Sequence, residues 1–182
     1  MKSQKEENSS NQSIKIVLIG LHNSGKTSIL NCLKGIKGIS AFNNPMPTKG
    51  LDVQSFKALD SKYTIWDLGG QEAYIDDYFN DFRKFTKGTR KIIYVIDIQD
   101  TKRYDNALKY LKRVIDSIKE QNNIDFSVFL HKFDPDLIFD SNLSEHVIND
   151  FILKIKEIFP PNFIYSLNKT TIYAIFEKNK VL

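Results

Sequence analysis

Residues 20–27, GLHNSGKT, combine two glycines, a lysine and a threonine at the spacing G-x-x-x-x-G-K-(S/T). Glycines at these places let successive backbone N–H groups point at phosphate oxygens, and a following helix adds partial positive charge at its N-terminus. Lys26 can place a charge on the β- and γ-phosphates, and the Thr27 hydroxyl can bind Mg²⁺. A chance glycine turn is the ordinary alternative, which the apolar run at 14–20 disfavours. The pattern predicts a nucleotide phosphate site formed by His22, Asn23, Ser24, Gly25, Lys26, Thr27 and Ser28.

A second motif, DLGGQ at residues 67–71, directly follows a predicted strand. A carboxylate at a strand end, here Asp67, can hold Mg²⁺ through water. The N–H of Gly70 can contact a γ-phosphate, and Gln71 can orient an attacking water molecule. The alternative is a plain glycine turn with a solvent-facing glutamine, but the position after a strand and downstream of Lys26 favours function.

Thr48 follows Pro47 in the long loop at residues 35–50. A loop hydroxyl can close over Mg²⁺ and the γ-phosphate and release when that phosphate leaves. Alone, a loop threonine is more often simply polar, so this assignment depends on the neighbouring motifs. We therefore expect the catalytic residues to be Gln71, Lys26 and Thr48, and the metal ligands to be Thr27, Thr48 and Asp67.

The motif HKFD at residues 131–134 ends another predicted strand, where ligands bind in doubly wound sheets. Asp134 can accept hydrogen bonds from N1 and N2 of guanine, and adenine offers no such donors. The stem of Lys132 can lie over the purine ring. We expect Ser166 and Leu167 to follow the last strand and supply a backbone N–H to guanine O6. The alternative is a polar loop with His131 at the edge of the core.

Strands and helices that could position these motifs alternate along the chain. Apolar or alternating runs predict strands at 14–20, 51–59, 62–68, 91–98, 125–131 and 163–167. Helical spacing predicts helices at 25–34, 104–120, 143–159 and 170–178. The hairpin at 51–68 would turn near residues 60–61. We expect an α/β fold: a mostly parallel six-stranded sheet with one antiparallel edge strand and helices on both faces.

Composition limits the remaining possibilities. The 182 residues suit a polar, disordered N-terminal arm at 1–13 followed by one domain at 14–182. Cys32 is the one cysteine, so a disulfide framework is excluded and a cytoplasmic location is expected. No dense Lys/Arg block accompanies the net charge of +4, which argues against a nucleic-acid partner. Lys2 and the terminal KNKVL carry no lipidation signal, so we expect no lipid anchor.

Taken together, these motifs resemble those of the Ras-superfamily small GTPases, in the same order along the chain. GLHNSGKTSIL (20–30), PTKG (47–50) and WDLGGQ (66–71) resemble the Arf family. Trp66 resembles the Arf tryptophan of an effector patch, although a half-buried hairpin aromatic is an equal alternative. The resemblance implies a P-loop small-GTPase (G domain) fold, with GTP/GDP and Mg²⁺ as cofactors.

The second half of the chain resembles the Rag/Gtr family more closely. The stretches that carry this likeness are AYIDDYFNDFRKF (73–85), KIIYVIDIQD (91–100), FSVFLHKFD (126–134) and SLNKTTIYAIF (166–176). His131 stands where most of the superfamily has asparagine, and guanine binding should survive because histidine can offer one N–H. His22 stands where Arf proteins have aspartate, and whether it reaches the γ-phosphate or points to solvent is open.

The resemblance implies a GDP/GTP molecular switch with Mg²⁺-dependent GTP hydrolysis, served by an exchange factor, a GTPase-activating protein and effectors. No arginine is placed by a motif to act as a finger in cis, so unassisted turnover should be about 10⁻⁴ to 10⁻³ per second. The sequence has neither an Arf-type myristoylated helix nor a Rag-type roadblock domain. We therefore expect membrane contact only through partners, and pairing only through a separate roadblock-type or GTPase partner.

Two other functions remain open. A GTP-bound scaffold or binding module would hold nucleotide with little or no hydrolysis, and a Gln71→Leu change would then leave turnover unaltered. An ATP-binding P-loop protein is the third reading, against which Asp134 argues. Nucleotide competition separates it from the others.

Overall fold

The computed structural model describes residues 13–35, 47–58, 61–118, 123–139 and 143–172. Most of the expected N-terminal arm, much of the long loop and all but the first three residues of the expected closing helix lie outside these ranges. The strands are β1 (Ile14–Ile19), β2 (Leu51–Ala58), β3 (Ser61–Leu68), β4 (Thr89–Asp97), β5 (Asp125–His131) and β6 (Tyr165–Lys169). The helices are α1 (Lys26–Leu33), α2 (Glu72–Asn80), α3 (Phe82–Thr86), α4 (Tyr104–Ile118) and α5 (Glu145–Ile158). Two short 3₁₀ helices, η2 (Thr101–Arg103) and η3 (Pro135–Phe139), follow β4 and β5.

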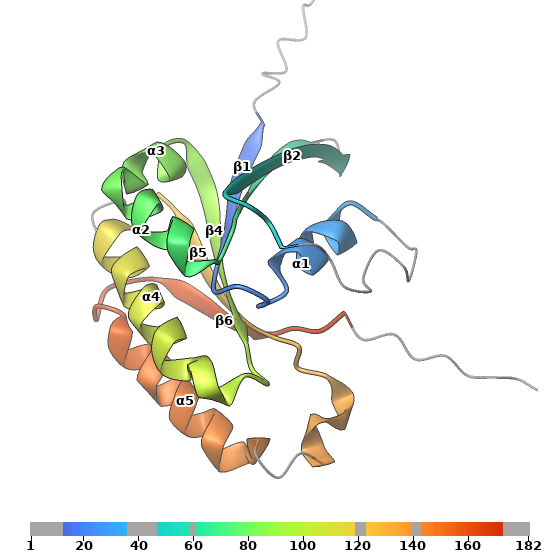
Figure 1. Cartoon of the computed structure of the whole chain (residues 1–182), viewed down its shortest axis with the longest axis vertical. Coiled ribbons are helices and arrows are strands. Elements are labelled where there is room, and N and C mark those ends of the chain that lie inside the picture. The colour runs from blue at the N-terminus through green and yellow to red at the C-terminus, as the bar shows by residue number, and fades with distance from the viewer. Residues whose placement is uncertain (1–12, 36–46, 59–60, 119–122, 140–142, 173–182) are drawn as a thin grey trace, which may run out of the picture.

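The six strands form one sheet in the order β2-β3-β1-β4-β5-β6. Only β2 runs antiparallel, against β3, and the remaining neighbours are parallel. Figure 1 shows α1 on one side of the sheet and α2 to α5 on the other. The predicted fold class is therefore confirmed, including the antiparallel edge strand. Because the parallel strands share one direction, the loops after β1, β3, β4 and β5 meet at one edge.

Each face of the sheet has its own hydrophobic core, and alternate residues of a strand serve opposite cores. Val17 of β1 packs in the larger core, with helices α2, α4 and α5, whereas its neighbour Leu18 packs in the smaller core beneath α1. The continuous apolar runs at β1 and β4 arise because both faces are covered. The buried sheet thus forms a rigid base for its loops.

Two helices were not predicted. The aromatic and acidic stretch after Gln71, where no element is expected from the sequence, forms α2 and α3. Ile75, Tyr78 and Phe82 are buried at helical spacing, and Phe79 stacks on Phe82 with 4.9 Å between ring centroids. The helical period is readable there, since Asp76 and Asp77 lie on the exposed side of α2, and Asp81 marks the break between α2 and α3.

The last strand was placed two residues too early. It spans Tyr165–Lys169 rather than 163–167, because Phe163 belongs to an aromatic cluster before the strand. Its ring packs edge-on against Phe126 and tilted against Phe159. Residues 170–172 are not helical, so the beginning of the predicted closing helix is wrong, and residues 173–178 lie outside the described ranges.

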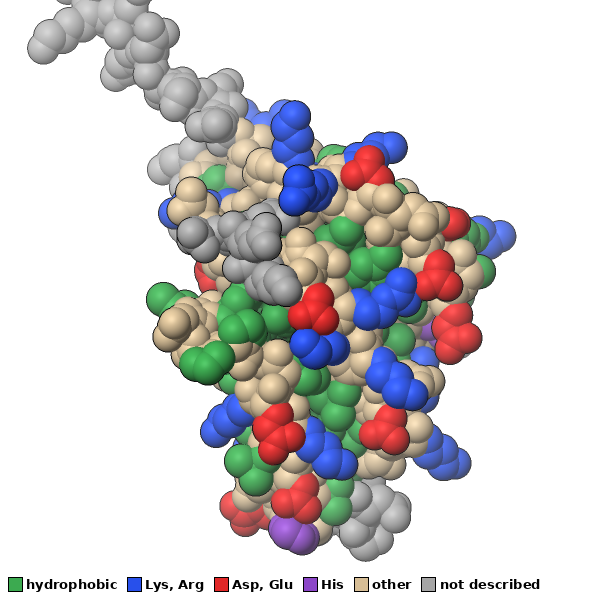
Figure 2. Space-filling model, turned by 90° about the vertical axis from the view of Figure 1, so that its left-hand side faces the viewer, with side chains coloured by type: hydrophobic (Ala, Val, Ile, Leu, Met, Phe, Trp, Pro, Cys, Tyr) green, Lys and Arg blue, Asp and Glu red, His purple; other side chains and the backbone are tan. Residues whose placement is uncertain are grey.

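On the helical face seen in Figure 2, Lys and Arg side chains are intermixed with Asp and Glu. This face therefore carries no single-sign patch of the kind that nucleic-acid binding uses. Within the described residues, no helix combines the length and apolar character that crossing a membrane requires.

Candidate functional site

The loop between β1 and α1 is shaped by its glycines and closely packed against its surroundings. Asn23 and Gly25 have positive φ angles of 63° and 94°, which turn the chain sharply before α1 begins at Lys26. A Cβ at Gly25 would lie 2.3 Å from Cδ2 of His131, so only glycine fits against that ring. The loop predicted to bind phosphate therefore turns tightly between β1 and α1 and touches the end of β5.

Lys26 is enclosed by this loop. Its Nζ donates to the backbone carbonyls of Gly20 and Leu21, at 2.9 Å in each case. Burial lowers the pKa of Lys26 to about 8; the Asp67 carboxylate opposes this and the Arg103 guanidinium adds to it. The ammonium group is still mostly charged at neutral pH, so it can serve a phosphate.

The three expected metal ligands meet at one point. Thr27 Oγ1 donates to Asp67 Oδ2 at 2.9 Å, and Thr48 Oγ1 donates to the same oxygen at 3.2 Å. The two hydroxyl oxygens are 3.2 Å apart. Burial raises the pKa of Asp67, and the nearby Lys26 opposes the rise. Three segments distant in sequence therefore bring hydroxyl and carboxylate oxygens together.

This oxygen set fits Mg²⁺, which prefers hard oxygen ligands and uses few protein carboxylates. Asp67 Oδ1 is buried without a hydrogen-bond partner, as is Ser24 Oγ in the adjacent loop. Unpaired buried oxygens are costly, and a bound ion and phosphate would satisfy them. Among the described residues, no group of three or more His, Cys, Asp or Glu side chains offers another kind of metal site.

Gly70 packs directly on the phosphate loop. A Cβ there would lie 2.3 Å from the carbonyl oxygen of Gly20 and 2.3 Å from the backbone nitrogen of His22. The His22 N–H donates to the Gly70 carbonyl at 2.8 Å. Gly69 is tied to Thr48's loop, since its N–H donates to Gly50 at 2.8 Å. Gln71 follows Gly70 as the N-cap of α2, and its role in orienting water stays a prediction.

His131 joins the base side to the phosphate side. It ends β5, and its buried ring lies against Gly25 while Nδ1 is 3.0 Å from Thr170 Oγ1. Burial lowers the pKa of His131, and the neighbouring Lys132 lowers it further. The lowered pKa favours the uncharged ring, which packs between the loop before α1 and the segment after β6.

The rest of HKFD is held by the loop after β4. Lys132 has a positive φ of 59°, and its Nζ forms an ion pair with Asp97 Oδ2 at 2.5 Å. Asp134 Oδ2 accepts from Gln99 Nε2 at 2.9 Å. Lys132 and Asp134 thus occupy the carboxyl-end edge of the sheet, as predicted for a base site.

The placement of Ser166 and Leu167 was wrong. Both lie inside β6, paired with Ser127 and Val128, and Ser166 Oγ is 2.8 Å from Ser127 Oγ. The two-residue shift of the strand carries them away from its end. The residues next to HKFD are instead Lys169 to Thr171: Phe133 N–H donates to the Thr170 carbonyl at 3.0 Å.

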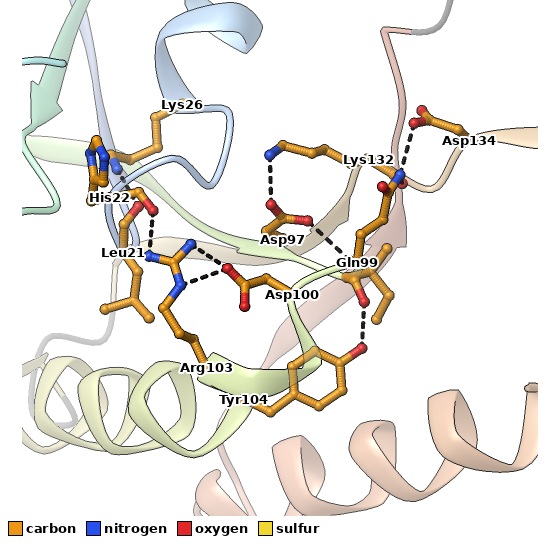
Figure 3. A network of polar contacts seen from close by, with 11 residues as sticks. Leu21, His22, Lys26, Asp97, Gln99, Asp100, Arg103, Tyr104, Lys132 and Asp134 are labelled. Carbon is orange, nitrogen blue, oxygen red and sulfur yellow. Dashed lines mark hydrogen bonds and ion pairs between the residues drawn. The ribbon is translucent and has the colours of Figure 1, made fainter. Parts of the chain in front are cut away.

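Sequence reasoning missed two residues of the β4–α4 connection. Arg103 forms an ion pair with Asp100, 2.5 Å from Nη2 to Oδ2, and its Nη1 donates to the His22 carbonyl at 2.9 Å. Gln99 reaches the opposite way, toward Asp134 (Figure 3). Their position in the sequence could have indicated them, because the loop after β4 starts at the same edge of the sheet as HKFD, which follows β5.

His22 contributes its backbone to these contacts, and its side chain is exposed. An exposed side chain fits both readings of this residue, contact with the γ-phosphate and orientation toward solvent.

Comparisons with known proteins agree with this fold. The model of the ADP-ribosylation factor family matches residues 1–160. Among solved structures, the Arl6 (BBS3) small GTPase from Trypanosoma brucei, with a bound nucleotide analogue GppNp, superimposes with a TM-score of 0.67. The two sequences are 18% identical, and the match covers 88% of this chain and 87% of the other. At 18% identity, the structural similarity shows a shared fold. The match to the family model shows family membership.

Proposed function

The chain belongs to the ADP-ribosylation factor family of small GTPases, and from that premise we propose that it is a GDP/GTP switch that hydrolyses GTP slowly with Mg²⁺. The observation that carries the proposal is the convergence of Thr27, Thr48 and Asp67 within 3.2 Å. In this proposal the loop that carries Thr48 moves toward the phosphate site when a γ-phosphate is bound and away from it after hydrolysis. The hydrogen bonds of Thr48 with Thr27 and Asp67 would then depend on the γ-phosphate.

The residues divide the chemistry among them. Lys26 places positive charge against the β- and γ-phosphate oxygens, and the loop N–H groups bind the rest of the phosphate chain. Thr27, Thr48 and Asp67 would hold Mg²⁺, directly or through water. When bound, the ion neutralises charge that develops on the phosphate oxygens. Gln71 orients a water molecule in line with the bond that breaks.

Slow turnover follows from where the arginines lie. Arg103 is the arginine in contact with the phosphate loop, but Asp100 and the His22 carbonyl already engage its guanidinium group. It therefore braces the loop instead of reaching over the phosphates. Turnover of about 10⁻⁴ to 10⁻³ per second is expected unless an activating protein supplies an arginine.

Guanine selectivity is assigned to Asp134, with the stem of Lys132 against the purine ring. The contact to guanine O6 is assigned to the segment after β6, at Lys169 to Thr171, in place of Ser166 and Leu167. Because HKFD has a histidine where asparagine is usual, the resemblance to the Rag/Gtr family stays a hypothesis. A roadblock-type or GTPase partner is part of the same hypothesis. Exchange factors, activating proteins and effectors, and a cytoplasmic location, likewise remain predictions.

Single-turnover hydrolysis of bound GTP tests the proposal. We expect the wild-type chain to release phosphate with Mg²⁺, and Gln71→Leu to slow release at least about tenfold, because positioned water contributes on that scale. Gln54→Leu is the matched control, since Gln54 lies on β2 and bonds to Asp52. Tight GTP binding with phosphate release at the protein-free rate would instead establish the scaffold or binding-module function.

A further inference from the structure

The carboxylate of Asp134 is held on both oxygens by this chain. Oδ2 accepts from Gln99 Nε2 at 2.9 Å, and Oδ1 accepts from the Thr171 hydroxyl. Gln99 comes from the end of β4 and Thr171 from the segment after β6, so the two contacts approach from opposite neighbours of β5 in the sheet. Figure 3 shows the Gln99 side chain extended toward Asp134.

Gln99 is itself fixed in place. The same Nε2 also donates to the Lys132 carbonyl at 2.8 Å, and the Gln99 backbone N–H donates to Asp97 Oδ1 at 3.0 Å. The Gln99 side chain has two partners, the backbone carbonyl oxygen of Lys132 and Oδ2 of Asp134, and both are hydrogen-bond acceptors. Only the amide nitrogen, with two N–H groups, can serve both, so the orientation of the amide follows from its partners. Gln99 therefore clamps the backbone and the carboxylate of HKFD together.

The number of acceptor sites matches a guanine base. An ionised carboxylate offers about four lone-pair sites, and Gln99 and Thr171 occupy one on each oxygen. One site on each oxygen remains, and guanine presents two donors side by side, at N1 and N2. Because both oxygens of Asp134 are held, the carboxylate cannot rotate. Its two remaining acceptor sites therefore face the N1–H and N2–H donors of guanine together.

We propose that Gln99 is a positioning residue for base selectivity: by holding Asp134, it makes the site distinguish guanine from bases that lack the 2-amino group. The inference rests on the proposed function, since it assigns a specific role within the same nucleotide site. The discrimination belongs to the N2 contact, because hypoxanthine keeps N1–H and O6 and lacks only that amino group.

The test compares the affinities of GDP and inosine diphosphate for the full chain. A hydrogen bond to a charged acceptor corresponds to roughly a ten- to hundredfold preference of the wild-type chain for GDP. Gln99→Met keeps the length of the side chain and removes both donors, so we expect the ratio of the two affinities to fall by about threefold or more. Gln99→Glu should lower it further, because a second carboxylate would face Asp134.

Gln54→Met is the matched control, because it removes a glutamine-to-carboxylate bond at Asp52, away from HKFD, and should leave the ratio unchanged. Gln99 is exposed, so its replacement spares the core. Equal losses of both affinities in Gln99→Met, with the ratio unaltered, would overturn the positioning role while leaving the proposed function standing. A wild-type chain that binds neither diphosphate would overturn the proposed function and the inference with it.

Discussion

At the residue scale, His131 shows how a histidine can stand where an asparagine is usual. Its ring packs against Gly25 and its Nδ1 contacts Thr170 Oγ1, so one side chain links the phosphate loop to the segment after β6. Those contacts bury the ring, and burial favours its neutral form. The substitution therefore brings a titrating group into the site.

This titration predicts a pH dependence with a definite sign. The pKa of His131 lies below 6.5 in the folded chain, so the unfolded chain binds the proton first as the pH falls. Its contribution to stability is complete above pH 6.5 and is lost as the pH falls from there toward the lowered value. We expect the melting temperature to drop between pH 7.5 and pH 5.5, and to drop less in His131→Asn.

Thermal melts in matched buffers measure this difference. His146→Asn is the control, because His146 is exposed on α5, with its Nε2 3.4 Å from Asp150 Oδ2. Identical pH profiles for the wild-type chain and His131→Asn would contradict the account.

Asp67 is the carboxylate of the proposed Mg²⁺ site. Asp67→Asn removes the carboxylate that Thr27 and Thr48 share, so Mg²⁺ should bind about ten- to a hundredfold more weakly. Titrating Mg²⁺ against the rate of GDP release measures the change. Asp52→Asn is the matched control, since Asp52 pairs with Asp67 across the hairpin and is not a predicted ligand. Equal Mg²⁺ dependence in both variants would argue against the assigned metal site.

At the element scale, the phosphate loop depends on a close approach to β5. Gly25→Ala adds a Cβ 2.3 Å from the His131 ring at a positive φ of 94°. Gly88→Ala imposes similar backbone strain at a φ of 70°, but no atom lies within 4 Å of its Cβ. We expect Gly88→Ala to cost about 1 kcal/mol with nucleotide affinity unchanged, and Gly25→Ala to cost more.

Gly25→Ala should also weaken GDP binding by at least about tenfold. The added methyl group would push the phosphate loop away from the His131 ring, and the loop N–H groups would then be misplaced for the phosphates. Denaturant unfolding and GDP titration of the two variants check both statements. If the two alanines behaved alike, backbone strain alone would explain the glycine, and the packing against His131 would have no role.

The elements also show what could be read from the sequence. Strands β1, β4 and β5 were predictable because buried parallel strands are continuous apolar runs, and the loop after β1 was predictable because its glycines, lysine and threonine follow a fixed spacing. Ser166 was misplaced because Phe163 is as apolar as a strand residue, and only its packing against Phe126 and Phe159 shows that the strand starts later. Contacts such as Arg103 with His22 depend on which loops the sheet order makes neighbours, and residue spacing does not contain that information.

At the scale of the whole molecule, the proposed nucleotide site is assembled from the loops that follow β1, β3, β4, β5 and β6 and from the segment that precedes β2. Each loop is tied to another: Thr48 to Asp67, Gly70 to His22, and His131 to Thr170. A ligand that bridges these loops binds only the folded chain, and its binding free energy adds to stability.

Saturation with ligand should therefore raise the melting temperature. GDP with Mg²⁺ at a hundred times its dissociation constant would add about 2.7 kcal/mol, or roughly 5–10 °C for a domain of this size. A thermal shift assay with GDP, with ADP as control and with a chelator added last, measures it. A shift of the same size with ADP, or one that survives chelation, would disagree with the assigned roles of Asp134 and Asp67.

The most direct test of guanine-nucleotide binding is competition at the site itself. A fluorescent GDP analogue is bound to the wild-type chain with Mg²⁺, and unlabelled GDP, GTP, ADP and ATP are titrated against it. GDP and GTP should displace the analogue at concentrations at least about a hundredfold lower than ADP and ATP, because adenine offers Asp134 no pair of donors. Displacement by ATP as readily as by GTP, or no binding of the analogue at all, would contradict the account.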